Sequence, residues 1–337
     1  MKTKNTMFQL IIVIFVVIFM AIPVSVCAGK LTLKLSHQWP QDTEDYVVKT
    51  AIRFADEITK RTNGEIKINF YPGQSLVKAT EQFKAMRQGI IDMSVYPTIY
   101  AAREIPELNI VLVPWANSHD NFFKFGKSKA WAYLEKKMND VGVKSLCWIQ
   151  IAGGIASKDK PIRTPEDVKG VKIRAAGKYC QLAYKNAGAG IVGMASSEIY
   201  TAMQRGLLDA VQTSSSSFGA FKLYEVSKYY VSPQDYSNYF TCEPISISMK
   251  TWKKLTPEQQ KIMEEVGKEL EPWALKAAKT EDARVAGLFA KNGCVVEKMT
   301  ADDYAKWVPF MKESIQEFKK SVPNGEWLAD ETLKIYK

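Results

Sequence analysis

Histidine is scarce in this sequence, which contains only His37 and His119. Neither has an acidic residue or a thiol at the spacing of a known catalytic or metal-binding motif, and HExxH, GxSxG and GxGxxG are all absent. Gly126-Lys127-Ser128 matches the end of a phosphate-binding loop, but Asn121 stands where the leading glycine is required. The sequence therefore predicts a protein that is not an enzyme and that uses no metal and no cofactor.

Cysteine is also sparse and widely spaced. Of the five cysteines, Cys147, Cys180, Cys242 and Cys294 form no CxxC pair, which argues against metal binding and redox catalysis. An oxidising compartment would permit disulfides, and four cysteines allow three pairings. Buried free thiols are the alternative, and the sequence leaves both open.

Beyond the N-terminal region, no run of residues is apolar for long enough to cross a bilayer. The formal charge is +10, and it falls to +8 without Lys2 and Lys4. No run of basic residues interleaved with aromatics predicts a nucleic-acid groove, so we expect no nucleic-acid partner. The excess charge indicates a solvated basic surface, or a weak field that favours anionic ligands.

The N-terminus has the parts of a secretory signal. Lys2 and Lys4 precede the apolar run from Leu10 to Ile22, and small residues follow it. The best cleavage point is after Ala28, and lipid modification of Cys27 is the rival interpretation. We therefore expect residues 1–28 to be a signal peptide and the mature protein to be exported to the periplasm.

Short β-branched runs alternate with helical patterns along the mature chain. Strands are predicted at 31–36, 65–71, 91–96, 143–151, 171–174 and 208–213, with helices at 42–61 and near 80–88. Strands separated by helices are typical of βαβ units, so the expected fold class is α/β with mostly parallel sheets.

A long polar helix is predicted near the end of the chain. Thr256-Pro257 supplies an N-cap followed by a proline at the first helical position, and the pattern continues to about Lys291. About 34 residues in a helix extend roughly 50 Å, more than the width of one lobe of this size. We expect this helix to brace two lobes from outside, with a kink at Pro272.

Three stretches of the sequence form an ordered set of motifs. The first runs from Thr62 to Leu76 (TNGEIKINFYPGQSL) and continues into MRQGIIDM at 86–93. The second is TPEDVKGVKIR at 164–174, and the third is MASSEIYTAMQRGLLD at 194–209. Taken together and in order, they resemble the extracytoplasmic solute-binding subunits of tripartite ATP-independent periplasmic (TRAP) transporters, of the dicarboxylate type, and the resemblance covers nearly the whole mature chain.

The resemblance implies a two-lobed α/β fold, with a cleft between the lobes that closes over ligand and a long helix spanning both. The expected division is residues 29–151 with about 240–275 in one lobe, 152–239 with about 276–325 in the other, and 326–337 as a C-terminal tail. It also implies that the protein hands its ligand to TRAP membrane permease subunits.

The resemblance implies a central role in ligand binding for Arg174. A guanidinium can hold a carboxylate through two parallel hydrogen bonds, and Arg174 ends an apolar strand that can aim it into a cleft. Thr213 stands where some relatives, including sialic-acid binders, carry a ligand-contacting asparagine. Those binders also carry a further arginine where this chain has Ala152-Gly153-Gly154, a departure that argues against sialic acid as the ligand.

Further ligand-binding candidates are polar and aromatic residues at strand ends that face the expected cleft. They are His37, Trp39, Tyr96, Thr98, Gln150, Phe218, Tyr239, Phe240 and Glu243. Their aromatic content favours an apolar or aromatic carboxylate over a hydroxylated sugar acid. The predicted function is capture of a small organic carboxylate; a ligand-sensing subunit for a membrane receptor and a secreted enzyme are the alternatives.

Overall fold

The computed structural model describes residues 30–41, 44–113 and 118–336. The predicted signal peptide, its cleavage site and Cys27 lie outside these residues.

The first lobe is built on a five-stranded sheet with the order β2-β1-β3-β11-β4. Strand β1 pairs in parallel with β2 and β3, and β11 runs antiparallel to β3 and β4. Its strands are β1 (Leu31–His37), β2 (Ile66–Tyr71), β3 (Met93–Val95), β4 (Val143–Cys147) and β11 (Ile245–Ser248). Its helices are α2 (Tyr46–Arg61), α3 (Gln82–Gln88), α4 (His119–Phe125), α5 (Lys129–Asp140) and α9 (Met249–Trp252), with 3-10 turns η2 (Ala79–Glu81), η3 (Thr98–Ala101) and η4 (Pro106–Leu112).

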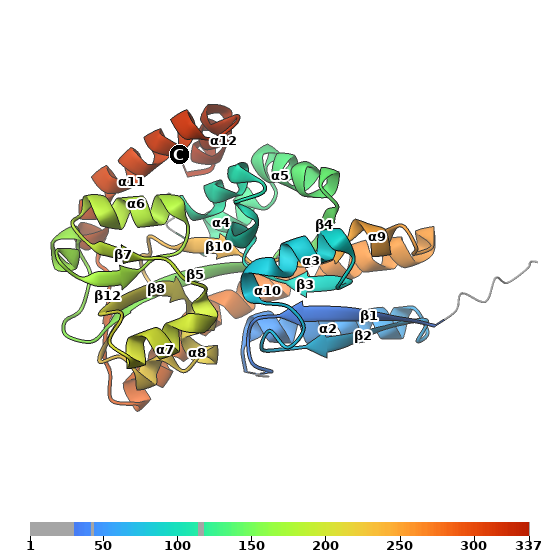
Figure 1. The fold of residues 1–337 in the computed structure, drawn as a ribbon, viewed down its shortest axis with the longest axis horizontal. Helices are drawn as coiled ribbons and strands as arrows, with labels where there is room; N and C mark the ends of the chain where they lie inside the picture. The colour runs from blue at the N-terminus through green and yellow to red at the C-terminus, as the bar shows by residue number, and fades with distance from the viewer. Residues whose placement is uncertain (1–29, 42–43, 114–117, 337) are drawn as a thin grey trace, which may run out of the picture.

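The second lobe is built on a seven-stranded sheet with the order β12-β9-β5-β8-β6-β7, and β10 pairs with the first residues of β5. Its strands are β5 (Gln150–Ser157), β6 (Lys172–Arg174), β7 (Gly190–Val192), β8 (Ala210–Ser214), β9 (Tyr229–Ser232), β10 (Phe240–Cys242) and β12 (Val295–Lys298). The helices around it are α6 (Lys178–Asn186), α7 (Ile199–Gln204) and α8 (Ser215–Ala220), with 3-10 turns η5 (Pro165–Val168), η6 (Ser196–Glu198) and η7 (Leu223–Glu225). Figure 1 shows the two lobes side by side, with β5 and β10 between them.

Two expectations about the sheets are wrong. The sheets are mixed, because β5 runs antiparallel to β8, β9 and β10, and β11 runs antiparallel to both of its neighbours. The single strand predicted at 143–151 is two strands, β4 in the first lobe and β5 in the second. The chain changes sheets at Trp148 and Ile149, and the return crossing leads from β10 to β11. Strands that cross between lobes enter the new sheet in a direction set by the crossing, which accounts for the antiparallel pairs.

Helix α10 (Pro257–Lys291) connects the two lobes, as predicted. It begins with a capping box in which the Thr256 hydroxyl accepts from the Gln259 N–H (3.2 Å) and the Gln259 side chain accepts from the Thr256 N–H (3.1 Å). It continues without a break through Pro272 and packs on α2 and β4 of the first lobe and on α8, β9 and β12 of the second. In Figure 1 it passes from the side of α9 to the side of α8.

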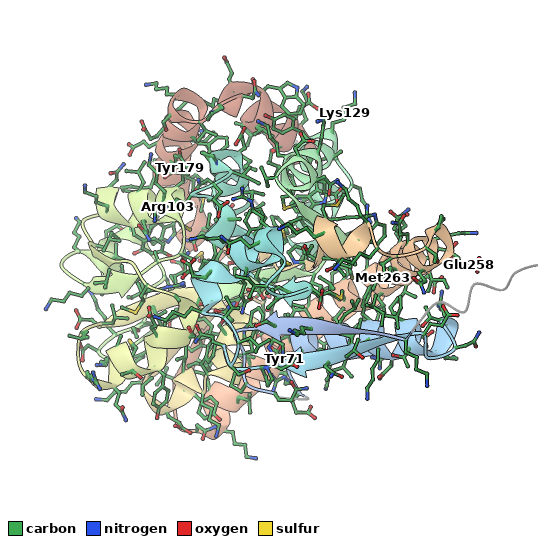
Figure 2. The ribbon with its side chains drawn as sticks, turned by 45° about the vertical axis from the view of Figure 1, so that its right-hand side comes forward. Tyr71, Arg103, Lys129, Tyr179, Glu258 and Met263 are labelled. Carbon is green, nitrogen blue, oxygen red and sulfur yellow. The ribbon has the colours of Figure 1, made fainter. Side chains whose placement is uncertain are left out.

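The C-terminal residues form a second bridge that the sequence did not predict. Helix α11 (Ala301–Ser321) packs on α6, where the rings of Phe318 and Tyr179 (labelled in Figure 2) lie 5.2 Å apart. The residues expected to be a tail form helix α12 (Gly325–Leu333) and a final turn η8 (Lys334–Tyr336). Helix α12 packs on α5 of the first lobe, with the rings of Trp327 and Tyr133 5.3 Å apart.

Within the part of the chain that the structure describes, no helix is both long and apolar enough to cross a membrane. The four cysteines in that part are free and buried, so the free-thiol alternative is the one observed.

Candidate functional site

Arg174 is the last residue of β6 and lies between Val192 of β7 and Val211 of β8. Its side chain is buried, with 2% of the residue exposed. The Nε and one Nη donate to the Met194 carbonyl (3.2 and 3.1 Å), and the other Nη donates to the Gln212 carbonyl (2.9 Å). A guanidinium has five N–H groups, so two remain for a ligand. The main chain thus holds the guanidinium in place, and it can still bind a carboxylate through two hydrogen bonds.

An apolar wall next to Arg174 is contributed by both lobes. Tyr239 and Ala176 pack with Leu112 and the partly buried Ile99, which come from the first lobe. Burial raises the pKa of the Tyr239 phenol above its usual value, so this hydroxyl stays neutral. The positive charge of the Arg174 guanidinium acts on the same phenol and lowers its pKa, but by less. The arrangement offers a ligand one cationic contact and an apolar surface.

A pair of glycines in β5, Gly153 and Gly154, packs closely against Tyr239 and the neighbouring strands. A Cβ on Gly153 would lie 2.1 Å from the Thr213 carbonyl and 2.5 Å from Cδ1 of Tyr239, and a Cβ on Gly154 would lie 2.3 Å from the Val231 carbonyl. Because these are mainly backbone contacts, a larger residue needs the neighbouring strands to move apart. The backbone at Gly153 and Gly154 therefore does not accommodate an arginine at either position without such a movement.

The end of β1 brings His37 and Trp39 together, with their rings 6.2 Å apart. Both are buried, and the Trp39 Nε1 has no hydrogen-bond partner within the described residues. Burial lowers the pKa of His37 to about 4, an effect that Gln41 and the Trp39 backbone only partly offset. His37 is therefore neutral near pH 7 and offers uncharged imidazole nitrogens.

Three further candidates lie where the chain crosses between the lobes. Gln150 donates through Nε2 to the His119 carbonyl (2.8 Å), and its own main-chain carbonyl accepts from the Tyr46 hydroxyl (2.7 Å). Glu243 is buried, and its Oε2 has no partner among the described residues. Burial and then the charge of Asp45 raise the pKa of Glu243 well above its usual value. Phe240 packs its ring edge-on to His119, with the centroids 5.5 Å apart.

A buried polar cluster joins the lobes beside these crossings; we call Asp45, Ser215, Ser216, Asp282 and His119 the interlobe polar cluster. The Ser216 hydroxyl of α8 donates to Asp45, the N-cap of α2 (2.5 Å), and the Ser215 hydroxyl donates to Asp282 of α10 (2.5 Å). Asp282 also lies 2.8 Å from the Nε2 of His119. Burial, reinforced by the nearby Glu281, raises the pKa of Asp45 to about 7.

Three other candidates, Tyr96, Phe218 and Thr98, make packing or hydrogen-bond contacts within the fold. Tyr96 packs against Phe83 in the core of the first lobe, and Phe218 packs against Tyr230 and Phe289 in the core of the second. Thr98 donates its hydroxyl to the Cys242 carbonyl (3.2 Å). Tyr96 and Phe218 therefore lie within the cores of their lobes. Thr98 instead links η3 of the first lobe to β10 of the second, one residue before Ile99 of the apolar wall.

Thr213 is buried on β8 and pairs with Gly154 of β5. It lies one residue after Gln212, whose carbonyl accepts from Arg174. This places Thr213 at the same end of the sheet as the guanidinium.

Sequence reasoning missed the residues that meet across the cleft. Gln38 and Tyr100 of the first lobe contact Ser196 of the second, and His119 meets Asp282 although 163 residues separate them. Only the fold brings such pairs together, so no spacing rule could have found them. Within the described ranges, no group of three or more His, Cys, Asp or Glu residues could hold a metal ion.

Comparison with known proteins places this geometry in a family. The family model described as bacterial extracellular solute-binding protein, family 7 (DctP) matches residues 35–321. A solute-binding protein of Albidiferax ferrireducens is 39% identical over 279 residues, covering 82% of each chain. The C4-dicarboxylate-binding periplasmic protein DctP of Rhodobacter capsulatus is 26% identical, covering 86% of each chain.

Solved structures show the same fold. A TRAP periplasmic solute-binding protein from Rhodoferax ferrireducens with bound malonate superposes with a TM-score of 0.88 at 35% identity, covering 90% of this chain and 98% of that one. A TRAP solute-binding protein from a Sulfitobacter species with bound β-D-galacturonate superposes with a TM-score of 0.82 at 23% identity, covering 90% and 100%. The chain belongs to the DctP family of bacterial extracellular solute-binding proteins, the solute-binding proteins of TRAP transport.

Proposed function

We propose that this protein captures a small organic carboxylate in the cleft between its lobes and delivers it to the membrane subunits of a TRAP transporter. The observation that carries the proposal is the buried Arg174 guanidinium, which the carbonyls of Met194 and Gln212 hold in place while two of its N–H groups remain for a ligand. A buried cation with no carboxylate partner in the described part of the chain is well suited to an anionic ligand. Arg174 forms no salt bridge with an acidic side chain among the described residues.

The remaining candidates extend the proposed site. Tyr239 supplies an apolar surface with Ile99 and Leu112 of the first lobe, and His37 and Trp39 supply neutral polar groups at the end of β1. This combination favours a carboxylate with a compact apolar or aromatic body over a highly hydroxylated one. The malonate bound by the Rhodoferax protein is consistent with a small ligand.

We also propose that the protein is exported across the cytoplasmic membrane. Cleavage after Ala28 would release a mature protein to the periplasm, where the family's members capture solutes.

A thermal-shift screen of the mature protein tests the proposal. The panel would contain malonate, succinate, pyroglutamate, galacturonate, benzoate and phenylacetate, with the neutral malonamide and benzamide as controls. A carboxylate at a hundred times its dissociation constant should stabilise the protein by about 2.7 kcal/mol, a rise of very roughly 5 °C in melting temperature. Stabilisation by the neutral amides equal to that by their acids would contradict carboxylate capture.

A further inference from the structure

A group of hydrogen bonds closes the interlobe cleft at its rim. Ser196, the first residue of η6 in the second lobe, donates its N–H to the Tyr100 hydroxyl of η3 in the first lobe (2.9 Å). The Ser196 hydroxyl donates to Oε1 of Gln38, which follows β1 (3.2 Å). The hydroxyls of Tyr100 and Ser196 are 3.3 Å apart. Because the Ser196 hydroxyl proton is used for Gln38, Tyr100 is the donor in this third contact.

The segment that carries Ser196 is also the segment that holds Arg174. Met194 accepts two hydrogen bonds from the guanidinium, and Ser196 follows only two residues later. Two residues of chain span at most about 7 Å. The Ala195 N–H donates to the Glu198 carboxylate (3.1 Å), which further restrains the segment. A displacement of the guanidinium should therefore displace Ser196 by a similar amount.

We propose that Tyr100, Ser196 and Gln38 form a latch that holds the lobes closed over a carboxylate bound to Arg174, and that Met194 couples the latch to the guanidinium. The inference rests on the proposed function for the identity of the ligand. The latch residues act through the closed conformation and through Arg174; they are positioning residues and do not need to touch the ligand.

The location of these contacts separates them from the interlobe polar cluster. Tyr100, Met194 and Ala195 line an open groove of about 410 Å³ at the surface, so the latch lies at the rim of the cleft. The interlobe polar cluster lies beside the crossing segments, where a rotation of one lobe moves atoms least. Ser196 and Gln38 are only 4% and 2% exposed when the lobes are together. Opening exposes them to water, so each latch hydrogen bond counts in favour of the closed state by its net value only.

Tyr100→Phe removes the hydroxyl and keeps the ring, which makes it the sharpest variant. It removes the acceptor of the Ser196 N–H and the donor to the Ser196 hydroxyl, so we expect dissociation of bound malonate to become about tenfold faster. The association rate should stay within about twofold, because ligand enters through the open conformation, in which the latch is not formed. Ser196→Ala should also speed dissociation, and Ser196→Thr, which keeps a hydroxyl, should restore a slow rate.

The matched control is Tyr200→Phe, which removes a tyrosine hydroxyl that donates to Glu225 within the second lobe (2.9 Å). Stopped-flow tryptophan fluorescence with malonate as the probe gives both rates for each variant, and calorimetric melting of the ligand-free protein checks folding. A Tyr100→Phe protein that melts like wild type and releases malonate at the wild-type rate would overturn the latch.

A second measurement tests, in the ligand-free protein, whether the latch stabilises the closed conformation. Nitroxide labels on cysteines introduced at the exposed Lys67 of the first lobe and Lys185 of the second would report interlobe distances by pulsed electron resonance. We expect a closed population that Tyr100→Phe depletes and Tyr200→Phe leaves unchanged; an identical distribution in all three proteins would refute the latch. If malonate fails to bind wild type while Tyr100→Phe still depletes the closed population, malonate capture fails and the latch stands.

Discussion

Asp45 is a buried carboxyl whose titration should make the stability of the ligand-free protein depend on pH. Burial raises its pKa to about 7, against 3.8 in the unfolded chain. The folded protein therefore keeps this proton up to about pH 7, whereas the unfolded chain releases it near pH 3.8. The proton-linked stabilisation is complete below pH 3.8 and is lost as the pH rises through 7.

The size of the effect follows from the two pKa values. The contribution from Asp45 is about 2 kcal/mol at pH 5.5 and close to zero at pH 8. His37 acts in the opposite direction, because burial lowers its pKa to about 4 and its stabilising contribution is lost below pH 6.5. A variant is therefore needed to separate the contribution of Asp45 from those of the other titrating groups.

Asp45→Asn keeps the side-chain oxygen that caps α2, where the N–H groups of Val47 and Val48 donate (both 3.0 Å), and removes the titration. It also replaces the oxygen that accepts from the Ser216 hydroxyl, a change that does not itself depend on pH and therefore cancels when the two pH values are compared. Urea unfolding of the wild type and the variant at pH 5.5 and 8 gives the difference between their pH dependences, which we expect to be about 2 kcal/mol. Asp302→Asn, which changes an exposed carboxyl, is the matched control. Equal pH dependence in wild type and Asp45→Asn would refute the reasoning.

Two further changes test the packing of the site and of the long helix. Gly153→Ala forces a methyl group toward the Thr213 carbonyl and the Tyr239 ring, and should cost about 1–3 kcal/mol in urea unfolding and weaken stabilisation by ligand; a wild-type unfolding midpoint would show that β5 and β8 can separate freely. Thr256→Ala removes the N-cap of α10 and should cost about 1 kcal/mol, whereas Thr256→Ser should cost much less, and equal midpoints for the two variants would mean that the cap contributes nothing.

The elements that the sequence predicted well are those with strong local signals. The helix from Thr256 to Lys291 has a cap, a first-turn proline and a stop within a few residues of its ends, and the structure confirms it. The strand at 31–36 alternates clearly and is observed as β1. Local periodicity needs no knowledge of the rest of the chain, so such elements can be predicted from sequence alone.

The sheet directions could not be predicted in this way. Ile245 pairs with Val95, about 150 residues away, and the antiparallel direction of that pair depends on how the chain returns from the second lobe. The break between β4 and β5 has the same origin. Its residues Trp148 and Ile149 are as apolar and as buried as those of a continuous strand, so neither composition nor burial marks the boundary.

The residues of the candidate site also differ in how far the sequence marks them. Arg174 could be singled out from the sequence because a motif surrounds it and the resemblance gave that motif a meaning; that it binds the ligand stays a prediction. Tyr100 and Ser196 carry no such signal, since a tyrosine in a turn and a serine before a short helix are ordinary residues until the lobes come together. The pairing of Asp45 with Ser216 likewise depends on the closed arrangement of two lobes.

The measurement that tests the account most directly is calorimetric titration of wild type, Arg174→Lys and Arg163→Lys with the carboxylate that stabilises wild type most in the thermal screen. Lysine keeps the charge but loses the planar fork, so we expect Arg174→Lys to weaken binding by about 10- to 100-fold. Arg163, which pairs with Glu297 on the surface of the second lobe (3.0 Å), should be replaceable without effect. Equal affinity of wild type and a folded Arg174→Lys protein would contradict the claim that Arg174 binds the ligand carboxylate.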